Sequence, residues 1–144
     1  VPIDFDAKDE ADAKYAAYAA SRVQERIEKA GARVTLVVLD ACRNNPLGSG
    51  ADAPAGLAQL DVGENTFVAF ATEPGKVTAD GTGSNSPFTT AMLKYLTKTN
   101  TGTIFDTMLS VKKEIDALTA GRQQPSLVDG MTMTLHRPVA FPCL

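Results

Sequence analysis

The sequence predicts an α/β fold: a three-layer sandwich with a mostly parallel sheet and helices on both faces. Residues 34–39 and 66–71 are almost entirely apolar or β-branched. Such runs have no polar face, which is typical of strands in a parallel sheet that is covered on both sides. Segments with helical periodicity precede and follow these runs. This alternation of element types is the pattern of an α/β domain.

A helix is predicted over residues 9–30, ahead of the first strand. Its apolar residues recur at three- and four-residue steps: Ala16, Ala19, Val23, Ile27 and Ala30. Glu25 and Lys29 have the spacing of a favourable ion pair on the other face. Gly31 is the kind of residue that ends a helix, and the first buried strand follows at once.

The second half of the chain predicts two helices and a last strand. Ser86 is expected to cap a helix that has Pro87 at its first position, with Phe88 and Tyr95 in the core. Another helix is predicted from near Thr103 to Gly121, and an edge strand over 131–135. A short extended stretch is expected at 77–80, between the second strand and these helices.

Composition limits the classes of function. The chain has 144 residues, enough for one domain with a sizeable core, and a net charge of −3 with both signs interspersed. No basic patch indicates a nucleic-acid partner, and no apolar run is long enough to span a membrane. The two cysteines do not form a disulfide framework. We expect no metal ion or cofactor, and the sequence carries no targeting segment that would assign a compartment.

Cys42 comes two residues after an acid, Asp40, which follows the first buried strand directly. Catalytic groups of open α/β sheets gather outside the carboxyl ends of the strands. This position favours Cys42 as a nucleophile, which would have to react as a free thiolate. The alternative is a small buried hydrophobe, the commoner role of a lone cysteine.

The segment 40–46, Asp-Ala-Cys-Arg-Asn-Asn-Pro, resembles the nucleophile segment of bacterial caspase-like cysteine peptidases, which are relatives of metacaspases and paracaspases. The run 80–88 carries a second part of the resemblance, which extends over nearly the whole chain. It implies a single caspase-like domain over residues 1–144. In the family, a stretch similar to Val1-Pro2-Ile3-Asp4 follows the catalytic His-Gly. The resemblance therefore implies a domain that is incomplete at its N-terminal side.

The resemblance also implies a Cys–His dyad. Cys42 would attack the scissile carbonyl, and its backbone N–H would be one of two oxyanion donors. The histidine would come from an N-terminal segment or chain of the same protein, so we expect this chain alone to be inactive. The chain's single histidine, His136, is expected instead to be an exposed or locally packed residue at a strand end.

Paracaspases and metacaspases use the acid at the place of Asp40 to hold a basic P1 side chain. Asp80 stands where animal caspases carry the arginine that binds the substrate aspartate. Two carboxylates facing one pocket attract Arg or Lys and repel Asp. Val77, Thr78 and Ala79 would be the edge to which a peptide or protein substrate adds as a strand. The simpler alternatives are an Asp40 that caps loop amides, an Asp80 that serves the turn before Gly81, and an ordinary loop at 77–79.

These features predict a cysteine endopeptidase that cleaves after Arg or Lys. The alternative from another class is a catalytically inactive caspase-like scaffold or binding module, which the missing histidine would explain. A small-molecule α/β hydrolase is a third interpretation, and it lacks the expected Gly-x-Ser-x-Gly motif.

Overall fold

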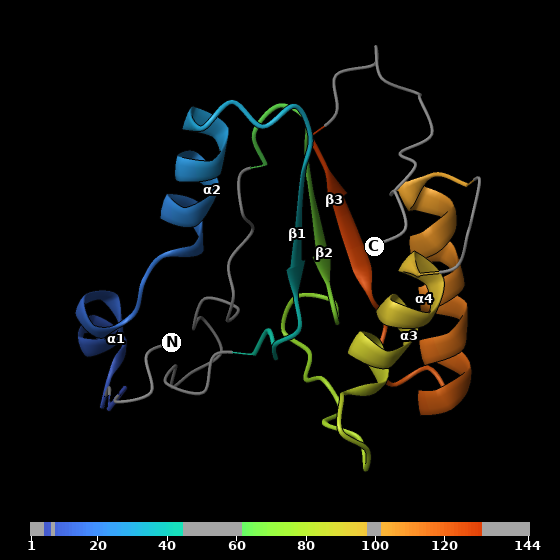
Figure 1. Ribbon diagram of the computed structural model, residues 1–144. Helices are drawn as coiled ribbons and strands as arrows, with labels where there is room; N and C mark the ends of the chain where they lie inside the picture. Colours follow the sequence, from blue (N-terminus) through green and yellow to red (C-terminus); the bar gives the residue numbers. More distant parts are fainter. Residues whose placement is uncertain (1–4, 7, 45–61, 98–101, 131–144) are drawn as a thin grey trace.

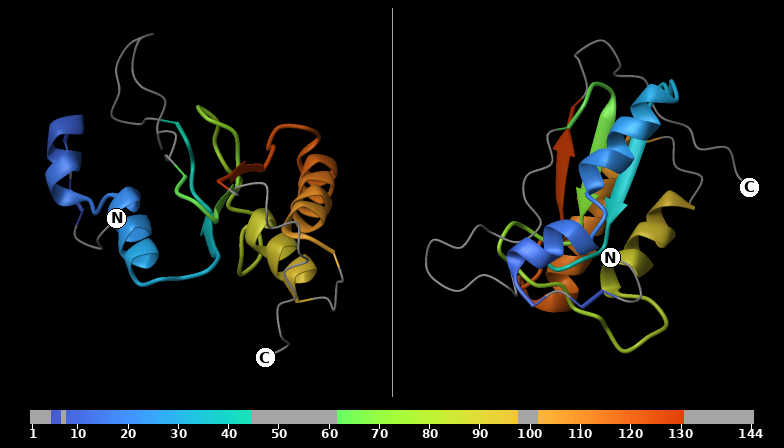
Figure 2. Two further views of the ribbon diagram at one scale, coloured as in Figure 1. Left: turned by 90° about the horizontal axis from the view of Figure 1, so that it is seen from above. Right: turned by 90° about the vertical axis from the view of Figure 1, so that its left-hand side faces the viewer.

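A computed structural model describes residues 5–6, 8–44, 62–97 and 102–130 (Figure 1). Its elements are, in order, α1 (Glu10–Ala16), α2 (Ala20–Lys29), β1 (Thr35–Leu39), β2 (Thr66–Phe70), α3 (Pro87–Leu96), α4 (Ile104–Thr119) and β3 (Ser126–Asp129). Figures 1 and 2 show α1 and α2 on one side of the sheet and α3 and α4 on the other. The predicted α/β class with helices on both faces is confirmed.

The described strands form one sheet in the order β1-β2-β3. β1 and β2 are parallel, with Thr35 opposite Thr66 and Leu39 opposite Phe70. β3 runs antiparallel to β2, so the sheet is mixed in the described part of the chain. Both predicted strands are confirmed to within one residue. β2 is buried throughout as predicted, whereas the prediction that β1 is buried on both sides is wrong, because β1 is only partly buried and Val38 is 41% exposed. Their parallel pairing brings the residues that follow β1 and β2 to the same end of the sheet.

The main core lies between β2 and the helix pair α3 and α4. Alternate residues Phe67, Ala69 and Ala71 face this core, as the period of a strand requires. The helices contribute Phe88, Ala91, Met92, Ile104, Met108, Val111 and Ile115. The predicted core position of Phe88 is confirmed at 0% exposure, and Tyr95 packs against the cluster while partly buried. The described residues contain no helix with the length and apolar character needed to cross a bilayer.

Two local predictions differ from the structure or fall outside it, and one observed strand was not predicted. The helix predicted over 9–30 is two helices, because the chain leaves helical geometry at Ala17 and Ala19. Nothing at these positions breaks a helix by propensity, which is a weak preference that tertiary context overrides. β3 was not predicted, since its four residues are too few to show the alternation of polar and apolar side chains that identifies a strand. The strand predicted at 131–135 lies outside the described residues.

Candidate active site

The segment that follows β1 is hydrogen-bonded to the turn that follows β2. The backbone N–H of Arg43 donates to the carbonyl of Lys76 at 2.8 Å, and the N–H of Gly75 donates to the carbonyl of Arg43 at 3.0 Å. The Arg43 side chain is 3% exposed, with its guanidinium carbon 3.9 Å from the centroid of the Phe70 ring. Burial lowers the pKa of Arg43. These contacts fix the backbone next to Cys42.

Cys42 is exposed, and its thiol lies against the segment that follows β2. The backbone N–H of Thr78 donates to Cys42 Sγ at 3.3 Å. The Thr78 hydroxyl oxygen lies 3.5 Å from the same sulfur. The structure therefore brings together the candidate nucleophile and a residue that the sequence placed on the substrate edge. The exposure of Cys42 contradicts the alternative of a small buried hydrophobe.

The carboxylate of Asp40 binds the first turn of α3. Ser86 Oγ and Thr89 Oγ1 both donate to Asp40 Oδ2, the latter at 2.6 Å. Ser86 also caps α3 as predicted, because its Oγ accepts from the backbone N–H of Thr89 at 2.9 Å. A carboxylate is favoured here, since the N-terminus of a helix carries partial positive charge. Within the described part of the chain, the partners of Asp40 are thus side-chain hydroxyls.

Asp80 is exposed and lies on the connection between these two contacts. It comes two residues after Thr78, so its Cα lies within about 7 Å of that of Thr78. The next residue, Gly81, has a φ of +77° and would place a Cβ 3.0 Å from Pro87 Cδ. The chain therefore turns at Gly81 directly against the start of α3. The chain thus runs from Thr78, beside Cys42, to Ser86, beside Asp40, and Asp80 lies between these two contacts in the sequence.

The edge expected at Val77, Thr78 and Ala79 is not a strand in the described structure. Val77 is 58% exposed, whereas the backbone N–H of Ala79 donates to Gln123 Oε1 at 3.0 Å. The amides of residues 78 and 79 thus both have partners within the protein. No strand among the described residues pairs with this segment, and a thiol and a buried amide side chain accept from its N–H groups instead. Its role as a substrate edge stays a prediction.

Three polar residues at the site were not predicted from the sequence. Ser86 was identified only as a helix cap, and Thr89 and Gln123 were given no role. The sequence feature that could have identified Thr89 is a hydroxyl residue three positions after the capping Ser86. For Gln123, the corresponding feature is an amide side chain two positions before Pro125, just ahead of β3. His136 lies outside the described residues, and those residues contain no cluster of three or more His, Cys, Asp or Glu that could hold a metal ion.

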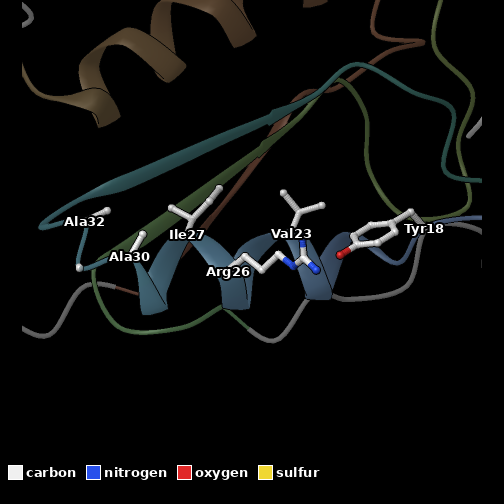
Figure 3. A pocket seen from close by; sticks show the side chains of 7 residues that line it. Tyr18, Val23, Arg26, Ile27, Ala30 and Ala32 are labelled. Atoms are coloured by element: carbon white, nitrogen blue, oxygen red, sulfur yellow. The ribbon is translucent and has the colours of Figure 1, made fainter.

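The described part of the chain also has a hollow beside α2, about 520 Å³ in volume. Figure 3 shows Ala30, Ile27, Arg26 and Val23 along this hollow, with Ala32 at one end and Tyr18 at the other. None of the site residues predicted from the sequence lines it. The hollow is therefore separate from the surroundings of Cys42.

Comparisons with known proteins bear on the fold and the family of this chain. A comparison with curated protein sequences gave no significant match. Caspase-1 from Spodoptera frugiperda is 20% identical, with a TM-score of 0.45; the match covers 66% of this chain and 42% of that one. Pro-sf-caspase-1 is 17% identical, with a TM-score of 0.53; the match covers 75% of this chain and 49% of that one. This chain thus spans less than half the length of these solved proteins, and the second match supports the fold.

The family assignment comes from the sequence over nearly its full length. The family model described as "Caspase domain" matches residues 6–136. This range includes β1, the segment with Asp40 and Cys42, and the connection that carries Thr78 and Asp80. The match agrees with the α/β fold, with the resemblance noted for residues 40–46 and with the pro-sf-caspase-1 comparison. The chain belongs to the caspase domain family.

Proposed function

We propose that this chain is the nucleophile-bearing part of a caspase-like cysteine endopeptidase that cleaves after Arg or Lys. The observation that carries the proposal is a pair of contacts at the end of β1. Thr78 contacts the thiol of Cys42, and Ser86 contacts the carboxylate of Asp40. The connection between Thr78 and Ser86 therefore begins beside Cys42 and ends beside Asp40, two residues that are only two positions apart in the sequence. A substrate held by this connection would lie next to the thiol.

In the proposed reaction, the Cys42 thiolate donates an electron pair to the scissile carbonyl carbon. The resulting oxyanion collapses to a thioester and expels the amine, which takes a proton from the histidine. Water then hydrolyses the thioester with the same histidine as base. The exposure of Cys42 supports this role, because a nucleophile must meet its substrate. The histidine is proposed to come from another segment or chain of the same protein.

The proposed specificity depends on two carboxylates. Asp40 is fixed at the N-terminus of α3 through its Oδ2, and Asp80 lies on the adjoining connection. A guanidinium or ammonium group placed between them would be attracted to both, and the planar fork of Arg suits bidentate binding. An Asp side chain in the same place would be repelled. The proposed substrates are therefore peptides or proteins with a basic P1 residue.

The nucleophile is tested on the full-length protein with fluorogenic peptides that differ only at P1. We expect hydrolysis of Arg and Lys peptides and none of Asp peptides. Cys42→Ala should abolish hydrolysis while the circular-dichroism spectrum stays that of the wild type. Turnover by Cys42→Ala, or no turnover of any peptide by the folded wild type, would contradict the proposal. The second outcome would favour an inactive caspase-like scaffold.

The specificity is tested with Asp80→Asn, and Asp116→Asn on α4 serves as the control for loss of an exposed carboxylate. Asp80→Asn should lower kcat/KM for Arg peptides about tenfold or more, because it removes one of the two charges that attract the P1 side chain. A tenfold change corresponds to about 1.4 kcal/mol of binding free energy. Asp116→Asn should leave it unchanged. Equal values for Asp80→Asn and the wild type would remove Asp80 from the proposed pocket.

A further inference from the structure

Gln123 is almost completely buried, yet its amide side chain reaches the segment next to Cys42. The residue is 2% exposed and follows the C-terminus of α4. Its Oε1 accepts from the backbone N–H of Ala79 at 3.0 Å, and its Nε2 donates to the carbonyl of Ala71 at 3.0 Å. One side chain thus links the residue after β2 to the proposed substrate edge, eight residues further along the chain.

The backbone at Gln123 is itself fixed by hydrogen bonds to the end of α4. Its backbone N–H donates to Thr119 Oγ1 at 3.1 Å, and Thr119 Oγ1 donates to the carbonyl of Ile115 at 2.8 Å. At the other end, the N–H of Ala71 donates to the carbonyl of Leu39, the last residue of β1, at 3.0 Å. The chain of hydrogen bonds therefore runs from α4 to the strand that leads to Cys42. Buried polar groups are costly without partners, which gives this arrangement one defined geometry.

The bond to Ala79 also sets the direction of the neighbouring carbonyl. A peptide unit is planar and trans, so the carbonyl of Thr78 points opposite to the N–H of Ala79. Since that N–H points at buried Gln123, the carbonyl points away from it. A carbonyl in this orientation can accept from a backbone N–H of a peptide laid beside the segment.

We propose that Gln123 is a positioning residue for substrate: its amide fixes the Thr78–Ala79 peptide unit so that the Thr78 carbonyl receives the peptide backbone beside Cys42. This inference rests on the proposed function, because it assumes that a peptide binds there. Gln123 acts through Ala79 and touches no reacting atom. Its loss should impair peptide binding more than the reactivity of the thiol.

The test uses Gln123→Met in the full-length protein, which keeps the length of the side chain and removes both hydrogen bonds. Gln124→Met, a change at the half-buried neighbour, is the matched control. We expect KM for Arg peptides to rise roughly tenfold or more in Gln123→Met, because misplacement at a site commonly costs such factors. The rate at which iodoacetamide alkylates Cys42, a reaction that needs no peptide strand, should change by a smaller factor than KM does. An unchanged KM in folded Gln123→Met, or equal rises in both variants, would overturn the proposal.

A second measurement serves if Gln123→Met does not fold. Amide hydrogen exchange of the wild-type protein should show Ala79 protected relative to Gly83, an exposed residue of the connection before α3. Equal exchange at the two amides would overturn the inference. Failure of the wild type to cleave any peptide is a different result, because it removes the proposed function and with it the substrate that Gln123 would position.

Discussion

The backbone N–H of Thr78 donates to the sulfur of Cys42 at 3.3 Å, and the Thr78 hydroxyl lies 3.5 Å from the same atom. The two residues are 36 positions apart in the sequence. The parallel pairing of β1 and β2 brings them together, because the segments that follow two parallel strands emerge at the same end of the sheet. The candidate nucleophile therefore has a backbone N–H donor and a hydroxyl group beside it before any substrate binds.

Replacement of the Thr78 hydroxyl should slow the reaction of the thiol. Thr78→Val keeps the backbone N–H and the branched shape but removes one group that stabilises negative charge on the sulfur. We expect alkylation of Cys42 by iodoacetamide to slow roughly fivefold, the factor that corresponds to a hydrogen bond worth about 1 kcal/mol. Thr78→Ser, which keeps the hydroxyl, is the control and should react at close to the wild-type rate. Equal rates for Val and Ser would show that the hydroxyl has no role.

The hydroxyl of Thr89 should affect the binding of Arg peptides through its hydrogen bond to Asp40. Thr89→Val removes the donor at 2.6 Å from Asp40 Oδ2, which leaves the hydroxyl of Ser86 as the partner of the carboxylate among the residues that the structure describes. In the full-length protein we expect KM for Arg peptides to rise several-fold, while Cys42 alkylation stays at its wild-type rate. Thr90→Val, on an exposed position of α3, is the matched control. Identical kinetics for the two variants would contradict a role for Thr89 in holding Asp40.

Gly81 should not tolerate a side chain. Its φ of +77° lies in the left-handed region, and a Cβ would come within 3.0 Å of Pro87 Cδ. Gly81→Ala should lower the free energy of unfolding by about 1–2 kcal/mol, the usual cost of that backbone conformation for a residue with a Cβ. In Gly83→Ala the added Cβ would meet its nearest neighbour at 3.9 Å, an ordinary contact. Urea unfolding should therefore separate the two variants, and equal stabilities would refute the argument.

The N-terminus of α4 should contribute a pH-dependent stability. Thr103 and Asp106 form a capping box, and the pKa of Asp106 is lowered, first by the backbone N–H of Thr103 and then by its hydroxyl. A carboxyl with a lowered folded pKa stabilises the protein above its unfolded pKa, and this contribution is lost as the pH falls through the folded pKa. Asp106→Asn should therefore destabilise the protein at neutral pH and become equivalent to the wild type in strong acid. A difference that is the same at both pH values would contradict the prediction.

The hydroxyl of Thr103 can be tested without a titration. Thr103→Ala removes the acceptor for the backbone N–H of Asp106. The expected loss is about 0.5–2 kcal/mol in the free energy of unfolding, the range found for such caps. Ser110→Ala is the control: its hydroxyl lies one turn further along α4 and donates to the carbonyl of Asp106 at 2.9 Å, so it accepts from none of the N-terminal amides. A loss no larger than that of the control would show that the cap does not stabilise α4.

The sequence by itself determined the local elements. The two apolar runs became β1 and β2, because apolar and β-branched residues favour the extended strand conformation. Burial on both faces holds for β2 and not for β1. Ser86 and Pro87 began α3 as predicted, since a capping hydroxyl and a fixed φ act within one turn of the chain. The position of Cys42 just after β1 was likewise determined locally. The break between α1 and α2 was not, because no residue there forbids a helix.

Only the tertiary structure decided which side chains meet. The contacts of Thr78 with Cys42, of Thr89 with Asp40 and of Gln123 with Ala79 join residues 36, 49 and 44 positions apart. Hydrogen bonds over such separations depend on strand pairing and helix packing, which a periodic pattern does not encode. The sequence could assign Asp40 to the site, but its partners required the N-terminus of α3 to pack at the end of β1. The physical reason is that propensity and capping act over a few residues, whereas a site forms where distant segments share one end of a sheet.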